Sequence, residues 1–386
     1  MPHRLPRRRF LQTTSAALVG ALVGTGMPGQ AAPAARAPAD RLPRTNLLVY
    51  RQRNGEVRPV RRRSHWRQRR AEILHGMVAI MGPLPGRRKR VPLEPAVSEE
   101  VDCGSHLRRL IHYTSEPGCR TPAYLLIPKP ALAARTRLPA VLCPHPTDDR
   151  VGHGVVVGLG GTRYPAYATE LAERGFVTLA PAYPLLANYQ PDIRALGYAS
   201  GTMKAVWDNL RGLDLLETLP FVRGGAFGAV GHSLGGHNSV FTAVFDDRLK
   251  VIVSSCGLDL FTDYYDGNPE VWRPERGWCQ LRYMPRLLEY AGRLEEVPFD
   301  FAELIGALAP RVCFLSAPLR DANFKWKSVA RVVAAARPVY ALLGKPDNLL
   351  VEHPDCEHDF PEAMREKAYA LLAEHLGGKS FQMVKP

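Results

Sequence analysis

Residues 229–236 read AVGHSLGG, and this stretch decides the fold. It contains the pattern G-x-S-x-G, with Ser233 at its centre. A short apolar run precedes the pattern, and a helix-like stretch, 234–245, follows it. The serine is therefore expected at a sharp strand-to-helix turn, which closes only when the flanking positions lack bulk. The helix that follows would direct its N-terminal amides at the hydroxyl, which suits a nucleophile whose reaction develops negative charge.

On either side of this turn, short apolar runs alternate with longer amphipathic stretches. The expected strands are 124–128, 140–143, 177–180, 229–231, 251–254, 312–316 and 349–352. The expected helices are 164–174, 203–219, 234–245, 325–336 and 362–376. This alternation predicts an α/β fold whose central sheet is mostly parallel and is covered by helices on both faces. An aromatic-rich insertion, 259–300, breaks the alternation and is expected to form a small cap over one end of the sheet.

A serine hydroxyl is a weak nucleophile until a base accepts its proton and an acid orients the base. With this motif, the acid and then the histidine follow the serine in chain order, each on a loop after a later strand. His358 lies in the loop before the last helix and is the predicted base. His353 comes directly after its strand, which is too early, and His375 lies inside the helical pattern.

The predicted acid is Asp321, because it lies on the loop after the expected strand 312–316. Asp259 is its rival, since the acid can also follow the preceding strand. Asp347 lies before the last strand, which is the wrong end of that strand to meet His358.

An oxyanion formed during the reaction needs two backbone N–H donors. Leu234, directly after the serine, is expected to supply one. The other should come from the loop after strand 140–143, which reads PHPTD at residues 144–148. Pro146 has no N–H, so Thr147 is the first usable donor, with Asp148 behind it. His145 is expected to support this loop.

The N-terminal region differs from the rest of the chain in charge. The sequence has 51 Lys and Arg against 37 Asp and Glu. Residues 1–70 hold 16 of the basic residues and two of the acidic ones, so residues 71–386 hold 35 of each sign. The basic character therefore belongs to the N-terminal segment, and nucleic acid is not an expected partner.

The first residues explain part of that charge. RRRFLQ at 7–12 is followed by an apolar stretch at 16–27 and by small residues near 31. This pattern resembles a twin-arginine signal peptide covering 1–31, which implies the twin-arginine export machinery as a partner and a periplasmic or secreted location. Residues 32–64 are expected to form a basic linker rich in Ala, Pro and Arg. The main domain is then 65–386, with a flanking helix at 65–82.

The seven cysteines are odd in number and form no C-x-x-C pair. No metal site, cofactor or redox motif is therefore expected. A disulfide between Cys103 and Cys119 remains open. No apolar run is long enough to span a bilayer, so no stable membrane anchor is expected.

Residues from about 65 to 377 resemble the α/β-hydrolase superfamily, especially its bacterial dienelactone-hydrolase-like and acetyl-xylan-esterase-like members. The matching motifs are HP at 145–146, GHSLGG at 231–236, APLRD at 317–321 and EHDFP at 357–361. The resemblance implies a cofactor-free serine hydrolase that cleaves carboxylic esters of a small molecule or a glycan.

The chain departs from the family pattern at two positions. Dienelactone hydrolases use cysteine where this chain has Ser233, and the usual His-Gly of the oxyanion loop is His145-Pro146 here. Two other functions stay open. One is a prolyl-oligopeptidase-like peptidase, which would share the triad, although this chain has no propeller-sized N-terminal domain. The other is a non-catalytic binding module on the same fold.

Overall fold

The computed structural model describes residues 41–133, 137–161 and 163–377. The predicted signal peptide lies outside these residues. No helix in the described part of the chain is long and apolar enough to cross a membrane.

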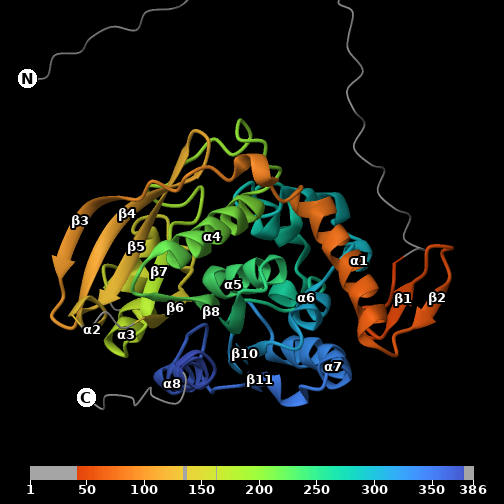
Figure 1. Cartoon of the computed structure of the whole chain (residues 1–386). Coiled ribbons are helices and arrows are strands. Elements are labelled where there is room, and N and C mark those ends of the chain that lie inside the picture. The colour runs from red at the N-terminus through yellow and green to blue at the C-terminus, as the bar shows by residue number, and fades with distance from the viewer. Residues whose placement is uncertain (1–40, 134–136, 162, 378–386) are drawn as a thin grey trace, which may run out of the picture. The chain divides into compact units, whose positions relative to one another are not determined.

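The centre of the structure is a sheet of nine strands within the described residues, ordered β11-β10-β9-β8-β6-β7-β5-β4-β3 (Figure 1). Six neighbouring strands, β6 to β11, are parallel, and β5, β4 and β3 continue the sheet in antiparallel fashion. The bounds are β3 Ala96–Asp102, β4 His106–Glu116, β5 Cys119–Pro128, β6 Leu138–Leu142, β7 Val177–Pro181, β8 Val222–His232, β9 Leu249–Ser255, β10 Val312–Ser316 and β11 Leu349–Glu352. The predicted mostly parallel sheet is confirmed.

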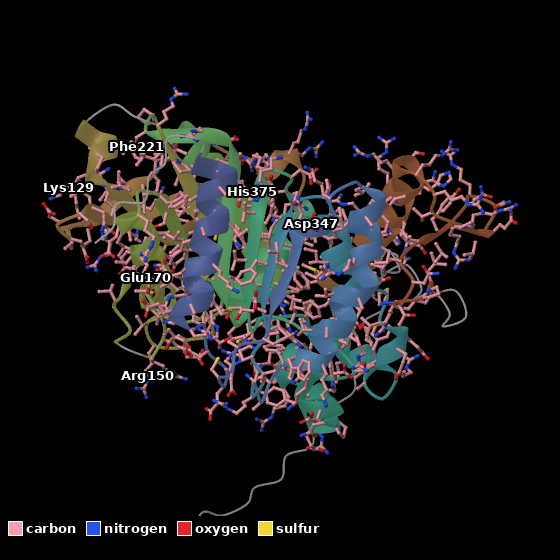
Figure 2. All side chains as sticks on the ribbon, turned by 90° about the horizontal axis from the view of Figure 1, so that it is seen from below. Lys129, Arg150, Glu170, Phe221, Asp347 and His375 are labelled. Carbon is pink, nitrogen blue, oxygen red and sulfur yellow. The ribbon has the colours of Figure 1, made fainter. Side chains whose placement is uncertain are left out.

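Helices cover both faces of the sheet. They are α1 Arg63–Met81, α2 Lys129–Ala133, α3 Tyr167–Glu173, α4 Gly201–Thr218, α5 Leu234–Phe245, α6 Phe301–Leu308, α7 Trp326–Leu342 and α8 Glu362–Leu372. One apolar core joins the sheet to α1, α4, α5, α6 and α7, and a second core joins the opposite face to α3 and α8. Figure 2 shows α8 lying across the strands on that second face.

Strands β3 and β4 and helix α6 are among the elements that the sequence did not predict. Strands β3 and β4 carry charged residues along their length, such as Glu99, Glu100 and Arg109, and this hides the apolar alternation typical of a strand. They form because each pairs with its neighbour in an antiparallel ladder at the sheet edge. Helix α6 is short and lies directly after the cap, where Asp300 caps its first turn and Glu303 completes a capping box.

The N-terminal segment requires a correction. Residues 41–62, which we expected to belong to a solvated linker, form a hairpin of β1 (Val49–Arg51) and β2 (Val57–Pro59) that leads into α1. Its apolar residues Leu42, Leu47, Tyr50 and Val60 are at most 5% exposed. Apart from the short run LLVY at 47–50, the apolar residues of this segment occur singly between arginines and polar residues, so the sequence shows no periodic pattern.

Some of the arginines of this segment are also part of the packing. Arg44 lies 2.5 Å from the fully buried carboxylate of Asp300, and Arg41 lies 2.7 Å from Glu303. Burial raises the pKa of Asp300 to about 6, and the charge of Arg44 opposes that shift. The segment therefore covers apolar surface and neutralises buried carboxylates, and it belongs to the folded domain.

We expect a chain that begins at Arg41 to keep the stability of the longer chain, and a chain that begins at Trp66 to lose several kcal/mol. Each buried apolar side chain that is removed contributes about 1.5–3 kcal/mol, and Asp300 would be left buried without Arg44. Urea unfolding midpoints of the two chains measure the difference. Equal midpoints would show that the hairpin contributes nothing to the fold.

Candidate active site

Ser233 occupies the turn between β8 and α5 with φ 54° and ψ −122°, a conformation that is rare for a residue with a side chain. The turn depends on glycine at two positions. A Cβ on Gly231 would lie 2.1 Å from the backbone of Gly235, and a Cβ on Gly235 would lie 2.2 Å from the carbonyl oxygen of Pro144. The Ser233 N–H donates to the Ser255 carbonyl at 2.8 Å, which ties the turn to β9.

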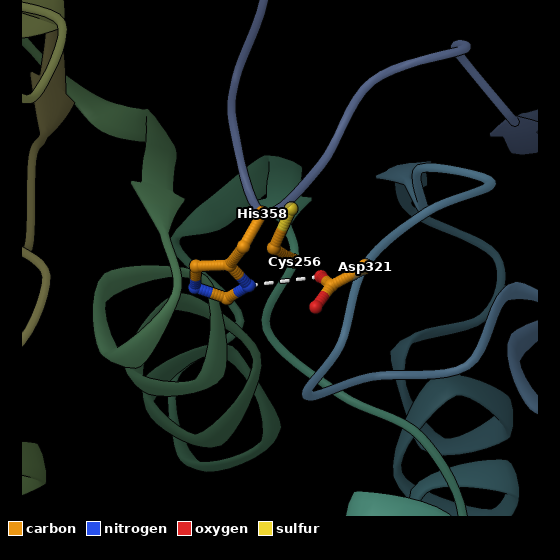
Figure 3. Close-up of side chains that lie close together, drawn as sticks. All are labelled: Cys256, Asp321 and His358. Atoms are coloured by element: carbon orange, nitrogen blue, oxygen red, sulfur yellow. Dashed lines mark hydrogen bonds and ion pairs between the residues drawn. The ribbon is translucent and has the colours of Figure 1, made fainter.

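Three side chains meet at the carboxyl ends of neighbouring parallel strands. The Ser233 hydroxyl donates to Nε2 of His358 at 3.0 Å. Nδ1–H of His358 donates to Oδ2 of Asp321 at 2.9 Å, the contact that Figure 3 shows as a dashed line. Ser233 follows β8, Asp321 follows β10, and His358 lies between β11 and α8. The structure thus brings together the three residues that the sequence singled out.

The environment of Asp321 keeps its carboxylate ionised. Burial acts to raise the pKa of Asp321, but the hydrogen bond from His358 and the amides of Asn323 and Phe324 outweigh it. The pKa of this carboxyl group therefore lies below its ordinary value. An ionised acceptor fixes the imidazole tautomer in which Nε2 is free to accept a proton.

The rival residues lie elsewhere. The Asp259 carboxylate accepts a hydrogen bond from the Lys325 amide at 3.1 Å, and burial raises its pKa well above the usual range. His353 has its Nδ1 2.8 Å from the Ala317 carbonyl, and His375 lies beside Glu374. Asp347 is exposed in the turn before β11.

Cys256 was not predicted, yet its Sγ lies within 4.8 Å of the ligand atoms of Asp321 and His358 (Figure 3). The thiol contacts the Asp359 carbonyl at 3.2 Å, and burial raises the pKa of the thiol well above its ordinary value. Metal binding by cysteine requires the thiolate. This group of three residues therefore suits a protonated thiol beside an acid–base pair better than it suits a metal site.

The loop after β6 is held from several sides. Nδ1–H of the buried His145 donates to the Pro146 carbonyl at 2.7 Å, and Nε2 accepts from the Tyr183 amide at 3.0 Å. Burial lowers the pKa of His145 to about 4, so the ring is neutral and can both donate and accept. His145 thus supports the loop, as expected.

This support leaves the amide of Thr147 available. The Thr147 carbonyl accepts from the Tyr164 hydroxyl at 3.3 Å, and its side-chain oxygen lies 3.0 Å from the hydroxyl of Tyr283. Within the described residues, the Thr147 N–H has no hydrogen-bond acceptor. Leu234 is the first residue of α5, so its N–H has no acceptor one turn earlier in the helix.

The tyrosines around this loop were missed by the sequence analysis. Tyr283 contacts Thr147 across 136 positions of the chain, and no local motif marks it. A richness in aromatic residues at 259–300 was the only available signal.

A pocket of about 1220 Å³ opens in front of the three residues and is lined by Ser233, His358, Leu234 and Thr147. Much of its wall comes from the insertion 259–300, through side chains such as Tyr264, Trp278 and Tyr283. The insertion consists of short 3₁₀ turns rather than α-helices. The arrangement joins a serine hydroxyl, an imidazole, a carboxylate and two N–H groups without protein acceptors to a large aromatic-lined pocket.

The mostly parallel sheet, its covering helices and the turn at Ser233 are those of the α/β-hydrolase fold, and solved structures similar to this one include several esterases. A glucuronoyl esterase from Solibacter usitatus has a TM-score of 0.68 at 20% identity, covering 86% of this chain and 98% of that one. A carbohydrate esterase family 15 glucuronoyl esterase from Caldicellulosiruptor kristjansonii has a TM-score of 0.63 at 16% identity, covering 88% and 93%. A structure described as a putative acetyl xylan esterase from Bacteroides fragilis has a TM-score of 0.55 at 18% identity, covering 82% and 87%.

Among characterised sequences, the chain is 24% identical over 317 residues to a protein of Bacillus subtilis (strain 168) named "Putative hydrolase YtaP". The match covers 80% of this chain and all of that protein. No family model matches the sequence.

The cysteines in the described residues are all free, including Cys103 and Cys119. The disulfide left open by the sequence is therefore absent. Cys119 is buried and its Sγ lies 3.4 Å from the Tyr189 hydroxyl.

Four buried histidines surround the site in neutral form. Burial is the leading cause that lowers the pKa to about 4 in His145 and to about 3 in His153, His232 and His237. His237 is the simplest case. Its ring is stacked between Phe241 and Trp278, and neither ring nitrogen has a protein partner among the described residues.

Because these histidines are neutral in the folded protein, we expect the free energy of unfolding to fall as the pH drops below about 6.5. Below this pH the histidines of the unfolded chain bind protons while those of the folded protein stay neutral. Each ring therefore lowers the free energy of unfolding by about 2 kcal/mol at pH 5, and the loss continues until the pH reaches the pKa of the ring in the folded protein. We expect His237→Phe to fold normally and to flatten this pH dependence, because the ring only packs. His145→Phe is the matched control, since it loses two hydrogen bonds and should be destabilised at neutral pH as well. Unfolding midpoints between pH 4.5 and 8 test both variants, and an unchanged slope in His237→Phe would contradict the prediction.

Proposed function

We propose that this protein is a serine hydrolase that cleaves carboxylic esters through Ser233, His358 and Asp321. The observation that carries the proposal is the unbroken hydrogen-bond chain from the serine hydroxyl through the imidazole to an ionised carboxylate. A strained serine at a glycine-bounded turn, facing an open pocket, is what nucleophilic attack on a carbonyl requires.

The reaction proceeds in two halves. His358 Nε2 accepts the hydroxyl proton as Ser233 Oγ attacks the ester carbonyl, and Asp321 stabilises the imidazolium that results. The N–H groups of Leu234 and Thr147 donate to the oxyanion of the tetrahedral intermediate. The intermediate collapses as the imidazolium protonates the leaving alcohol, which leaves an acyl-enzyme. Water, deprotonated by His358, then attacks the acyl group by the same route and releases the acid.

Relatives support the choice of an ester over another acyl bond. Structures of the same fold are named glucuronoyl esterase and acetyl xylan esterase, and YtaP is named a hydrolase. We propose a small-molecule or glycan ester as the substrate, since aromatic walls such as Trp278 pack on sugar faces and on apolar groups alike.

We also propose export by the twin-arginine route, on the basis of RRRFLQ at residues 7–12. Proteins that fold before export need no disulfide, and the free cysteines agree with this order of events.

We expect Ser233→Ala to abolish hydrolysis, with a loss of about 10⁶-fold in kcat, because the covalent route loses its nucleophile. The variant should also lose reaction with a fluorophosphonate probe while its unfolding midpoint stays near that of the wild type. Ser239→Ala, in the same helix and away from His358, should retain both reactions. Labelling of Ser233→Ala at wild-type rates would remove Ser233 from the mechanism.

The two candidate acids can be separated in the same assay. Asp321→Asn should lower kcat by about 10⁴-fold, because an amide favours the wrong imidazole tautomer. Asp259→Asn should change kcat by less than about tenfold, since its carboxylate contacts the Lys325 amide rather than His358. If Asp259→Asn proved the more damaging of the two, the acid would have been assigned one strand too late.

A further inference from the structure

The wall of the active-site pocket is rich in arginine. Among its described lining residues there are four arginines, two glutamates, and no lysine or aspartate. The arginines are Arg163, Arg273, Arg276 and Arg282. The wall therefore has an excess of positive charge close to Ser233 and His358.

Two of these arginines are neutralised within the protein. Arg273 forms an ion pair with Glu270 at 2.6 Å, and Arg282 forms one with Asp149 at 2.8 Å. Arg163, Arg276 and Glu275 are the charged lining residues that remain after these two pairs, so the net excess is one positive charge, carried by the two arginines against a single carboxylate.

Arg276 and Arg163 form no ion pair with any residue that the structure describes, although the charge of Arg163 contributes to lowering the pKa of the nearby Asp148 carboxyl group. Arg163 lies on the loop between β6 and α3, with its guanidinium 5.1 Å from the ring centre of Tyr164. Arg276 lies in the insertion 259–300. The two unpaired cations thus come from separate segments that line one pocket.

The backbone of Arg276 is fixed although its side chain is exposed. Its N–H donates to the Arg273 carbonyl at 3.1 Å, and its carbonyl accepts from the Cys279 amide at 2.8 Å. The next residue, Gly277, has φ 43°, and a Cβ there would lie 2.4 Å from the Val271 carbonyl. This tight turn fixes the backbone position of Arg276, whose side chain lines the pocket.

We propose that the pocket selects esters that also carry a free carboxylate, and that Arg276 binds this carboxylate with Arg163 assisting from the opposite segment. The inference rests on the proposed ester hydrolysis and specifies its substrate class. A guanidinium presents paired N–H donors that match the two oxygens of a carboxylate. Unpaired cations at a pocket also raise the local concentration of anionic substrates.

The test compares two esters of the same shape, mono-4-nitrophenyl adipate and the corresponding neutral amide, 4-nitrophenyl adipamate. The wild type should prefer the anionic ester in kcat/KM, and Arg276→Ala should lower that preference by about tenfold. Raising the ionic strength should weaken it as well. Arg273→Ala is the matched control, because it removes the same charge from the same wall at a residue that is already paired. An unchanged preference in Arg276→Ala both for this pair and for the second pair of esters described next, or an equal loss in Arg273→Ala, would overturn the proposal.

A second pair of esters locates the carboxylate. The carboxylate of the substrate can also lie on the alcohol side of the scissile bond. In that case the Arg276-dependent preference should appear for 4-acetoxybenzoate over its neutral amide, 4-acetoxybenzamide, and not for the adipate ester over its amide. An Arg276-dependent preference in either pair supports the proposal.

Binding separates this inference from the proposed function. Calorimetry on the Ser233→Ala protein measures the affinity for each pair without any reaction. Tighter binding of an anionic ester that disappears in Ser233→Ala/Arg276→Ala supports the charge preference even if no ester is hydrolysed. If the wild-type protein neither hydrolysed any ester nor reacted with the fluorophosphonate probe, the proposed function would be refuted instead. Equal affinity for the anionic and neutral esters would refute the charge preference alone.

Discussion

The sharp turn at Ser233 is the constraint on which the rest of the site depends. Its positive φ holds the hydroxyl above the end of β8 and leaves the first amide of α5 without an acceptor. The turn can close because Gly231 leaves room for the backbone of Gly235, and Gly235 in turn packs directly against the Pro144 carbonyl. That contact brings the loop carrying Thr147 beside the serine. The nucleophile and the proposed oxyanion donors are therefore positioned by one piece of backbone packing.

Two carboxyl groups near this turn are both buried, yet their pKa values shift in opposite directions because their hydrogen-bond partners differ. Asp321 receives hydrogen bonds from an imidazole and two amides, and its pKa lies below the usual range. Asp259 receives one amide hydrogen bond among neighbouring acidic groups, and its pKa lies well above it. Two acids of equal chemical type thus have pKa values shifted in opposite directions, and only Asp321 contacts His358. The surrounding histidines, such as His145 and His232, remain neutral and act as uncharged spacers and hydrogen-bonding groups.

The insertion 259–300 links substrate contact to the reacting groups. Tyr283 lines the pocket and also contacts the side chain of Thr147, so the wall and the proposed oxyanion loop are in direct contact. The same insertion carries Trp278, whose ring stacks on His237 one turn into α5. The segment that differs most from a regular strand–helix alternation is therefore the one that shapes the pocket, as expected when function is added to a common fold.

The sequence by itself determined the parallel sheet, the serine turn, and Asp321 and His358 as candidates, because local patterns specify local structure. Apolar runs mark buried parallel strands, and G-x-S-x-G marks a turn that few other residues permit. Only the tertiary structure decided between Asp321 and Asp259, folded the hairpin at residues 41–62 onto the domain, and brought Tyr283 to Thr147. It also brought Arg276 and Arg163, which form no ion pair among the described residues, to the lining of one pocket. These outcomes depend on contacts between residues far apart in the chain, whose desolvation and charge pairing exist only once the chain has folded.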